Sequence, residues 1–167
     1  MIETMEPQFW SMTYQDQITR EEALNFYDEL DAVELEEMIG TWRGFELRTG
    51  HPMDGILEKM HWYGKAFHSV DNVDPLLFYK KNGSIFPADP GRLVDKMKLV
   101  PSDGGEARLR MVEHRGRITA TMIYDHLPIM DHFRKVSVDV VMGMMDMKNH
   151  PLPYFFYLKK LGGPTIR

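Results

Sequence analysis

Residues 107–124 read ARLRMVEHRGRITATMIY, and this stretch decides the fold class. A run of alternating apolar and polar residues lies on either side of Arg115-Gly116, a pair that suits a two-residue turn. Such a turn sets Leu109 opposite Met122 and gives one apolar and one mostly polar face. The stretch therefore predicts an antiparallel hairpin whose apolar face lies on a core.

Short runs of the same kind, separated by turn residues, extend this pattern along the chain. We expect a hairpin around Asn82-Gly83, and Pro151 and Pro153 mark a loop between the last two strands. About eight short strands indicate an antiparallel barrel or sandwich, and a barrel of that size can hold one small ligand. Outside the first hairpin, the expected strands are 42–48, 75–80, 84–86, 93–100, 138–147 and 154–159.

The N-terminal residues 1–36 have a helical pattern instead. Thr19 followed by Glu22 is a capping box that begins a helix, and Asp31 with Glu34 predicts a second cap before a short acidic helix. So short a segment has no core of its own. We therefore expect a helical extension that covers one face or mouth of the strands.

Composition excludes several classes of protein. The 167 residues have a net charge of −5 and a pI of about 5.8, which disfavours nucleic-acid binding. The absence of cysteine excludes disulfides, thiolate metal sites and cysteine nucleophiles. No apolar run is long enough for a membrane span, and residues 1–6 do not resemble a signal peptide. We expect a cytoplasmic protein, and its 14 methionines suit either a loosely specified core or an adaptable ligand surface.

The run Gly40-Thr41-Trp42-Arg43-Gly44 resembles the signature of the bacterial GXWXG family. Residues 62–67 and 75–77 are similar to the rest of that module, and residues 122–135 and 143–146 resemble its usual companion, a domain of unknown function. The resemblance implies a GXWXG module at 37–100 and a C-terminal module at 106–161, which together form one barrel domain. It implies an intracellular bacterial protein and no established activity.

The Gly40-Thr41-Trp42 start of this run is also similar to the strand start of lipocalins, fatty-acid-binding proteins and nitrobindins, which are barrels that hold a ligand inside. This likeness implies a mainly β (α+β) chain: a calycin-like antiparallel β-barrel with the N-terminal helices packed on it and the Trp42 end closing its base. Glu46 replaces the third glycine of the nitrobindin motif, and no clear counterpart of the haem-ligating histidine is found. Haem binding is the weakest of the alternatives.

The segment 124–132 concentrates groups suited to proton transfer. Tyr124 and His126 share one side of an extended strand, so an apolar interior would place both inside it, with Asp125 or Asp131 orienting a histidine. Alternatively, the two aspartates cap turns or form ion pairs with Arg134 and Lys135. A metal ion on His126, Asp131 and His132 is not expected, because neighbouring residues of a strand point to opposite sides and no typical ligand spacing occurs. No cofactor is predicted.

Candidate ligand-binding residues follow from the barrel interpretation. Inside a barrel, Lys65 or Arg43 would bind a carboxylate, although each residue taken singly suits a surface salt bridge better. The full candidate set is Trp42, Arg43, Lys65, Met111, Met122, Tyr124, His126 and Met144.

Three functions follow from these features. The first is binding of a small hydrophobic or acyl-type molecule in the interior. The second is an acid–base enzyme of the isomerase, hydratase or cyclase type that uses the tyrosine, histidine and aspartates of residues 124–131. The third is a protein-interaction module or homodimer formed through the acidic helix around Glu34–Glu37.

Overall fold

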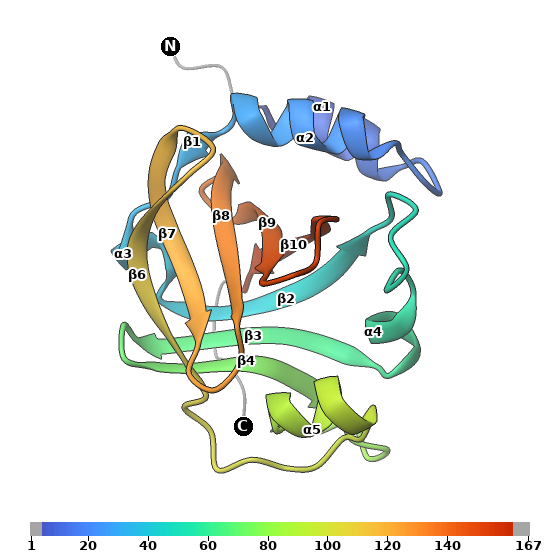
Figure 1. Cartoon of the computed structure of the whole chain (residues 1–167), viewed down its shortest axis with the longest axis vertical. Coiled ribbons are helices and arrows are strands. Elements are labelled where there is room, and N and C mark those ends of the chain that lie inside the picture. The colour runs from blue at the N-terminus through green and yellow to red at the C-terminus, as the bar shows by residue number, and fades with distance from the viewer. Residues whose placement is uncertain (1–4, 162–167) are drawn as a thin grey trace.

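The computed structural model describes residues 5–161, and within them ten strands form a single antiparallel sheet (Figure 1). Residues 1–4, part of the segment in which we expect no signal peptide, lie outside the described residues. The strands are β1 (Asp31–Ala32), β2 (Gly40–Leu47), β3 (Trp62–Ser69), β4 (Asn72–Tyr79), β5 (Ile85–Pro87), β6 (Ala107–His114), β7 (Arg117–Tyr124), β8 (Ile129–Ser137), β9 (Val140–Met147) and β10 (Tyr154–Lys160).

Eight of these strands form a closed ring. Their order is β8-β7-β6-β4-β3-β2-β10-β9, and β9 pairs again with β8. The pairing between β4 and β6 is the shortest in the ring: Val73 and Ala107 form its one paired position, and nearby the Leu109 amide donates to the Val70 carbonyl at 2.7 Å. A ring has no free edge between its strands, so each sheet face is either interior or exterior. The mainly antiparallel β architecture expected from the sequence is confirmed.

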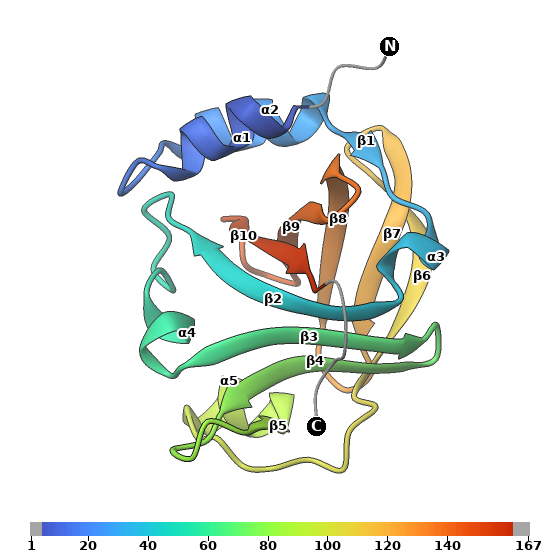
Figure 2. The ribbon, with the colours of Figure 1, turned by 180° about the vertical axis from the view of Figure 1, so that it is seen from behind.

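The helices lie around the ring (Figures 1 and 2). Helices α1 (Glu6–Thr13) and α2 (Arg20–Glu29) run side by side at one end, α5 (Pro90–Lys96) lies at the other, and the short helices α3 (Leu35–Met38) and α4 (Ile56–Lys59) flank β2. The predicted cap of α2 is confirmed, since the Thr19 hydroxyl accepts from the Glu22 amide at 3.0 Å. None of the helices in residues 5–161 has the length and apolar character to cross a membrane.

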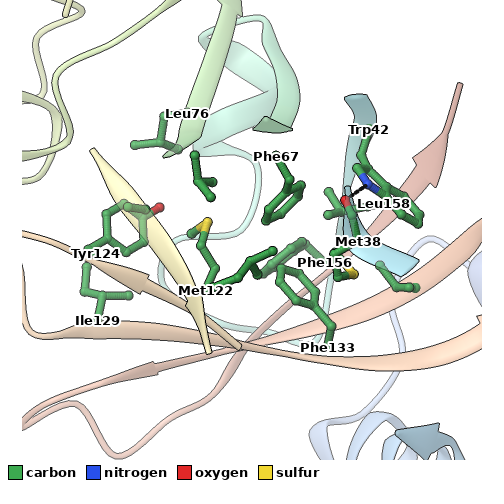
Figure 3. Packing of buried hydrophobic residues seen from close by; sticks show 14 of the residues in the cluster. Met38, Trp42, Phe67, Leu76, Met122, Tyr124, Ile129, Phe133, Phe156 and Leu158 are labelled. Carbon is green, nitrogen blue, oxygen red and sulfur yellow. Dashed lines mark hydrogen bonds between the residues drawn. The ribbon is translucent and has the colours of Figure 1, made fainter. Parts of the chain in front are cut away.

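Apolar side chains pack in two main layers, one inside the ring and one outside it. The interior layer includes Phe67, Met122, Phe133 and Phe156 (Figure 3). The exterior layer lies between α1, α2 and the outer face of β9 and β10, with Phe9, Tyr27, Met144 and Phe155 fully or almost fully buried. Both faces of β9 are therefore covered, which explains why its sequence is apolar at nearly every position.

The predicted hairpin is confirmed in its exact register. Leu109 pairs with Met122, and Arg115 and Gly116 form the turn with φ values of 52° and 83°. Its second face differs from expectation, because Thr119 and Thr121 are fully buried. The Thr119 hydroxyl accepts from the Val33 amide at 2.9 Å and donates to the Phe133 carbonyl. The segment that leads into α3 therefore covers the Thr119 end of this face, whereas Arg108 and Arg110 at the other end are exposed.

Two sequence predictions of local structure are wrong. Half of the strand expected at 93–100 is helix α5, because the Asp89 side chain accepts from the Arg92 amide at 3.2 Å and Pro90 starts the helix with the backbone angle that it requires. The other half, residues 97–100, has no regular structure. Asp31 does not cap a helix but pairs with Lys135 in β1, and Glu34 caps α3 instead.

Candidate functional site

An apolar cavity of about 350 Å³ lies inside one end of the ring. Its mouth is formed by α4, by α5 with the exposed residues Val94 and Met97, and by His150 from the loop between β9 and β10. Leu76 and Ile129 contribute to its walls, with the Tyr124 ring beside them (Figure 3). A volume of this size is at the lower end of the range of about 300–1,000 Å³ found for small-molecule sites.

An irregularity in β3 places the buried cation of the cavity wall, Lys65. Register shifts on both sides of Gly64 break the alternation of the strand, so Trp62 and Lys65 both face the interior. The backbone of β2 approaches so closely here that a Cβ on Gly64 would lie 1.9 Å from the Trp42 carbonyl oxygen. The φ of Gly64 is +152°, which also favours glycine. Gly64 therefore permits the bulge that turns Lys65 inward.

Lys65 forms a buried ion pair with Asp131 of β8. Its Nζ lies 3.0 Å from Asp131 Oδ2 and donates to the Pro75 carbonyl at 3.0 Å, and both charged side chains are 3 % exposed. An ammonium group has three protons, so one remains after these two interactions. The rings of Tyr124 and Phe156 lie 5.8 and 5.1 Å from Nζ and provide cation–π contacts.

Burial dominates the electrostatics of this pair. Desolvation lowers the pKa of Lys65, and the attraction of Asp131 opposes this shift. Burial, followed by the charge of Asp131, raises the pKa of the Tyr124 hydroxyl well above its usual value. The wall thus combines a neutral phenol with a buried lysine–aspartate pair.

A second polar contact lies next to the cavity. The Tyr154 hydroxyl donates to Glu46 Oε1, while Oε2 of the same carboxylate accepts from the Gly55 amide at 3.1 Å and the Glu58 amide at 3.3 Å. Burial and the Glu46 charge raise the pKa of Tyr154. Glu46, at the position that is glycine in nitrobindins, is thus hydrogen-bonded to residues of α4 and β10.

The motif around Trp42 belongs to the interior layer but does not line this cavity. Trp42 is fully buried, and its indole donates to the Met38 carbonyl at 2.8 Å (Figure 3). The Trp62 ring packs against Gly44 so closely that a Cβ at this position would lie 2.4 Å from it, which explains the glycine. The two tryptophans thus occupy successive levels of the interior, and only Trp62 lines the cavity.

The structure brings together three of the candidates from sequence. Lys65, Tyr124 and Asp131 all line the cavity. Met122 and Met111 belong to the interior layer without lining the cavity itself.

Four other candidates lie elsewhere. Arg43 is on the outer face, where its guanidinium donates to the Trp62 and Tyr63 carbonyls at 2.8 and 2.7 Å. Met144 faces α1 and α2, since alternation along β9 turns Met145 and Met147 inward in its place.

His126 and Asp125 also lie outside the cavity, contrary to the expectation for His126. The strand ends at Tyr124, so the alternation that would place His126 inside stops there, and its side chain is exposed in the turn. Asp125 forms an ion pair with Arg108 at 2.7 Å, and not with the Arg134 or Lys135 that the ion-pair alternative named. The predicted tyrosine, histidine and aspartate cluster is therefore not assembled around His126.

Sequence analysis missed the pairing of Asp131 with Lys65 and the contribution of His150. The strand β8 was not predicted, although an extended reading of residues 129–135 places Asp131 and Phe133 on the same side as an apolar core. No local signal marks His150, which the loop after β9 brings to the mouth.

Comparisons with known proteins agree with this architecture. The GXWXG protein family matches residues 25–83, and a domain of unknown function (DUF4334) matches residues 105–160. No curated protein matches the chain. The crystal structure of a protein from Thermomonospora curvata is similar, with 37 % sequence identity, a TM-score of 0.78, and coverage of 95 % of this chain and 99 % of that one.

Proposed function

Since this chain belongs to the GXWXG protein family, with the DUF4334 domain following in tandem, we propose that it is a calycin-like barrel that binds one small, largely apolar molecule in its interior. The observation that carries the proposal is the apolar cavity of about 350 Å³ with a buried Lys65–Asp131 pair in its wall. At about 30 Å³ for each heavy atom, the value for liquid water, the cavity has room for roughly a dozen non-hydrogen atoms.

The ion pair defines the polar group that the ligand would carry. A carboxylate ligand would add a negative charge beside Asp131, and a buried net charge is expensive. A neutral hydroxyl or carbonyl accepts the remaining Lys65 proton without changing the charge of the site. The proposal therefore favours a neutral alcohol, aldehyde, ketone or ester over the fatty acid that the barrel likeness alone implies.

A displacement experiment tests the proposal. The protein is freed of bound lipid, loaded with the neutral fluorophore 1-aminoanthracene and titrated with 1-decanol or decanoic acid, which have similar size. We expect saturable probe binding and stronger displacement by decanol. Native mass spectrometry of the protein before delipidation shows whether a molecule of this class co-purifies.

Two variants separate cavity binding from surface binding. Ile129→Trp fills the cavity and is expected to weaken probe binding at least tenfold. Ile118→Trp is the matched control because Ile118 is an apolar residue that is 61 % exposed. Equal binding to both variants, or no saturable binding to the unaltered protein, contradicts the proposal.

One observation favours a second candidate, an acid–base enzyme acting on a small hydrophobic substrate. Lys65, Asp131 and Tyr124 line the same cavity, and burial lowers the pKa of the lysine. Deuterium incorporation next to the carbonyl of 2-decanone in heavy water, measured by mass spectrometry, tests it. Loss of incorporation in Tyr124→Phe supports this candidate, and the same rate with and without protein excludes it for ketones.

The cytoplasmic location and the homodimer through α3 stay predictions. Glu34 and Glu37 already cap α3 through each other, and Glu37 binds Lys135, so the acidic face has partners within the chain. Light scattering coupled to size-exclusion chromatography decides whether the chain is a monomer or a dimer.

A further inference from the structure

A second polar cluster lies on the outer face of the sheet, behind the cavity wall. His132 follows Asp131 on β8 and points to the opposite face, where it meets His114 at the end of β6 and Asp146 on β9. One ligand atom from each of these three side chains lies within 4.8 Å of the other two. The two imidazole rings stack in parallel, with centroids 3.8 Å apart and an angle of 6° between them.

Hydrogen bonds determine which nitrogen of His132 carries the proton. The Thr121 hydroxyl donates to the Thr119 carbonyl at 3.1 Å, so its oxygen is left to accept from His132 Nδ1 at 2.9 Å. In the neutral ring, Nε2 then presents a lone pair. This lone pair faces Asp146 Oδ2 at 3.3 Å, and a carboxylate oxygen also only accepts. The contact is unfavourable unless something positive lies between the two atoms.

His114 adds another unused group. Its Nε2 is buried and has no hydrogen-bond partner within residues 5–161. Arg134 is occupied by the carbonyls of Tyr27, Leu30 and His114. Two imidazole rings and one carboxylate thus converge at one point of the outer face.

We propose that His114, His132 and Asp146 bind a divalent first-row transition-metal ion such as Zn²⁺ on the outer face of the ring. Imidazole nitrogens favour this class of ion over Mg²⁺ or Ca²⁺, which take oxygen ligands. Thr121 orients His132 through Nδ1, as residues behind metal-binding histidines commonly do. The Asp146 side chain is 44 % exposed and gives the ion and its remaining water ligands access to solvent. Because ring lone pairs lie in the ring planes, the parallel stack opens when both rings turn toward the ion.

This site is independent of the interior cavity, since its ligands lie on the other face of the sheet. The test uses the whole chain after treatment with a chelator. Zn²⁺ is titrated in competition with a chromophoric chelator, Co²⁺ binding is followed by visible absorption, and Mg²⁺ serves as the negative control. We expect one Zn²⁺ per chain and a Co²⁺ spectrum with nitrogen and oxygen ligands.

Variants decide whether the ion binds at this cluster. Asp146→Asn keeps the shape of a half-exposed side chain and is expected to weaken Zn²⁺ binding at least tenfold, and His132→Gln to abolish it. The matched control is His68→Gln, because the half-exposed His68 pairs with Asp74 at 2.8 Å and residues 5–161 offer no third ligand there. This variant is expected to bind Zn²⁺ as the unaltered chain does.

Three results overturn the proposal. The first is that Asp146→Asn binds Zn²⁺ as tightly as the unaltered chain does, and the second is that Zn²⁺ binds no more tightly than Mg²⁺. The third is that ¹⁵N NMR of the metal-free chain at neutral pH shows a proton on His132 Nε2. The last result means that a proton, and not a metal ion, joins His132 to Asp146.

Discussion

Asp131 and His132 are neighbours on β8, yet they belong to opposite sides of the molecule. Asp131 meets Lys65 in the interior, where both charged side chains are 3 % exposed. His132 meets Asp146 on the outer face, where the carboxylate partner is 44 % exposed. β8 therefore contributes one member of a buried acidic–basic pair in the cavity wall and one member of a partly exposed pair on the outer face.

The difference shows how burial changes what the same kind of pair can do. The interior pair has a fixed charge balance, because removing either charge leaves the other without water or a partner. The outer pair can lose a proton or gain an ion, because solvent reaches Asp146. We expect variants inside the ring to act on stability and ligand choice, and variants outside it to act on cation binding.

The largest effect is expected from breaking the interior pair on one side only. Asp131→Leu leaves the Lys65 ammonium buried without its countercharge, and the free energy of unfolding should fall by about 3–5 kcal/mol. Urea unfolding followed by tryptophan fluorescence measures the loss. The Co²⁺ spectrum of the outer site should persist wherever the variant remains folded.

The double variant Lys65→Met/Asp131→Leu is the matched control. It removes both charges and fills a similar volume with apolar atoms, so it should recover most of the lost stability. A double variant that is as unstable as the single one would show that the loss comes from packing, and not from an unpaired charge.

A substitution at Gly44 should disturb the interior alone. A Cβ at this position would lie 2.4 Å from the Trp62 ring and push the indole toward the cavity. Overpacking of this kind costs about 1–3 kcal/mol, measurable for Gly44→Ala by urea unfolding. Affinity for 1-aminoanthracene should fall, while Zn²⁺ affinity should not change. Adding Trp62→Phe should restore part of the stability, and its failure to do so would argue against the ring contact.

The strands that the sequence predicts well are those with regular alternation. The hairpin of β6 and β7 follows from period-two patterning and a turn that tolerates left-handed residues, and its register is confirmed. Residues 93–100 have no such regularity, and the Asp89-Pro90 cap outweighs their β propensity. The β8 strand escapes prediction because its polar residues have specific partners on both faces, so it lacks an apolar–polar contrast.

The candidate site was less predictable because its geometry depends on pairings between distant strands. Strict alternation puts Trp62 and Lys65 on opposite faces, and only the bulge at Gly64 brings them together. Conversely, strand alternation continued past Tyr124 would put His126 inside, but β7 ends at Tyr124 and His126 is exposed. Met144 shows a second limit: β9 is apolar on both faces, so its sequence does not indicate which methionines turn inward.

Tyrosine ionisation should show how dry the cavity wall is. Burial raises the pKa of Tyr124, so above about pH 10 the unfolded chain releases this proton and the folded chain keeps it. Its contribution to stability is complete below pH 10 and declines by about 1.4 kcal/mol for each pH unit above it. Tyr124→Phe should therefore flatten the decline measured by urea unfolding between pH 10 and 11. Tyr14→Phe, at a residue that is 92 % exposed, is the control, and equal slopes in both variants would mean that water reaches Tyr124.

The smallest effect on stability is expected from Thr121→Val, which changes only the outer site. Valine keeps the volume of threonine but removes the oxygen that accepts from His132 Nδ1 and the hydroxyl that donates to the Thr119 carbonyl. Losing these bonds should cost about 1 kcal/mol in urea unfolding. Because the His132 ring then loses its orientation, Zn²⁺ affinity should fall by about tenfold while 1-aminoanthracene binds as before. Unchanged Zn²⁺ affinity would show that His132 is held by its stacking on His114, and a parallel loss of probe binding would show that the two faces of β8 are coupled.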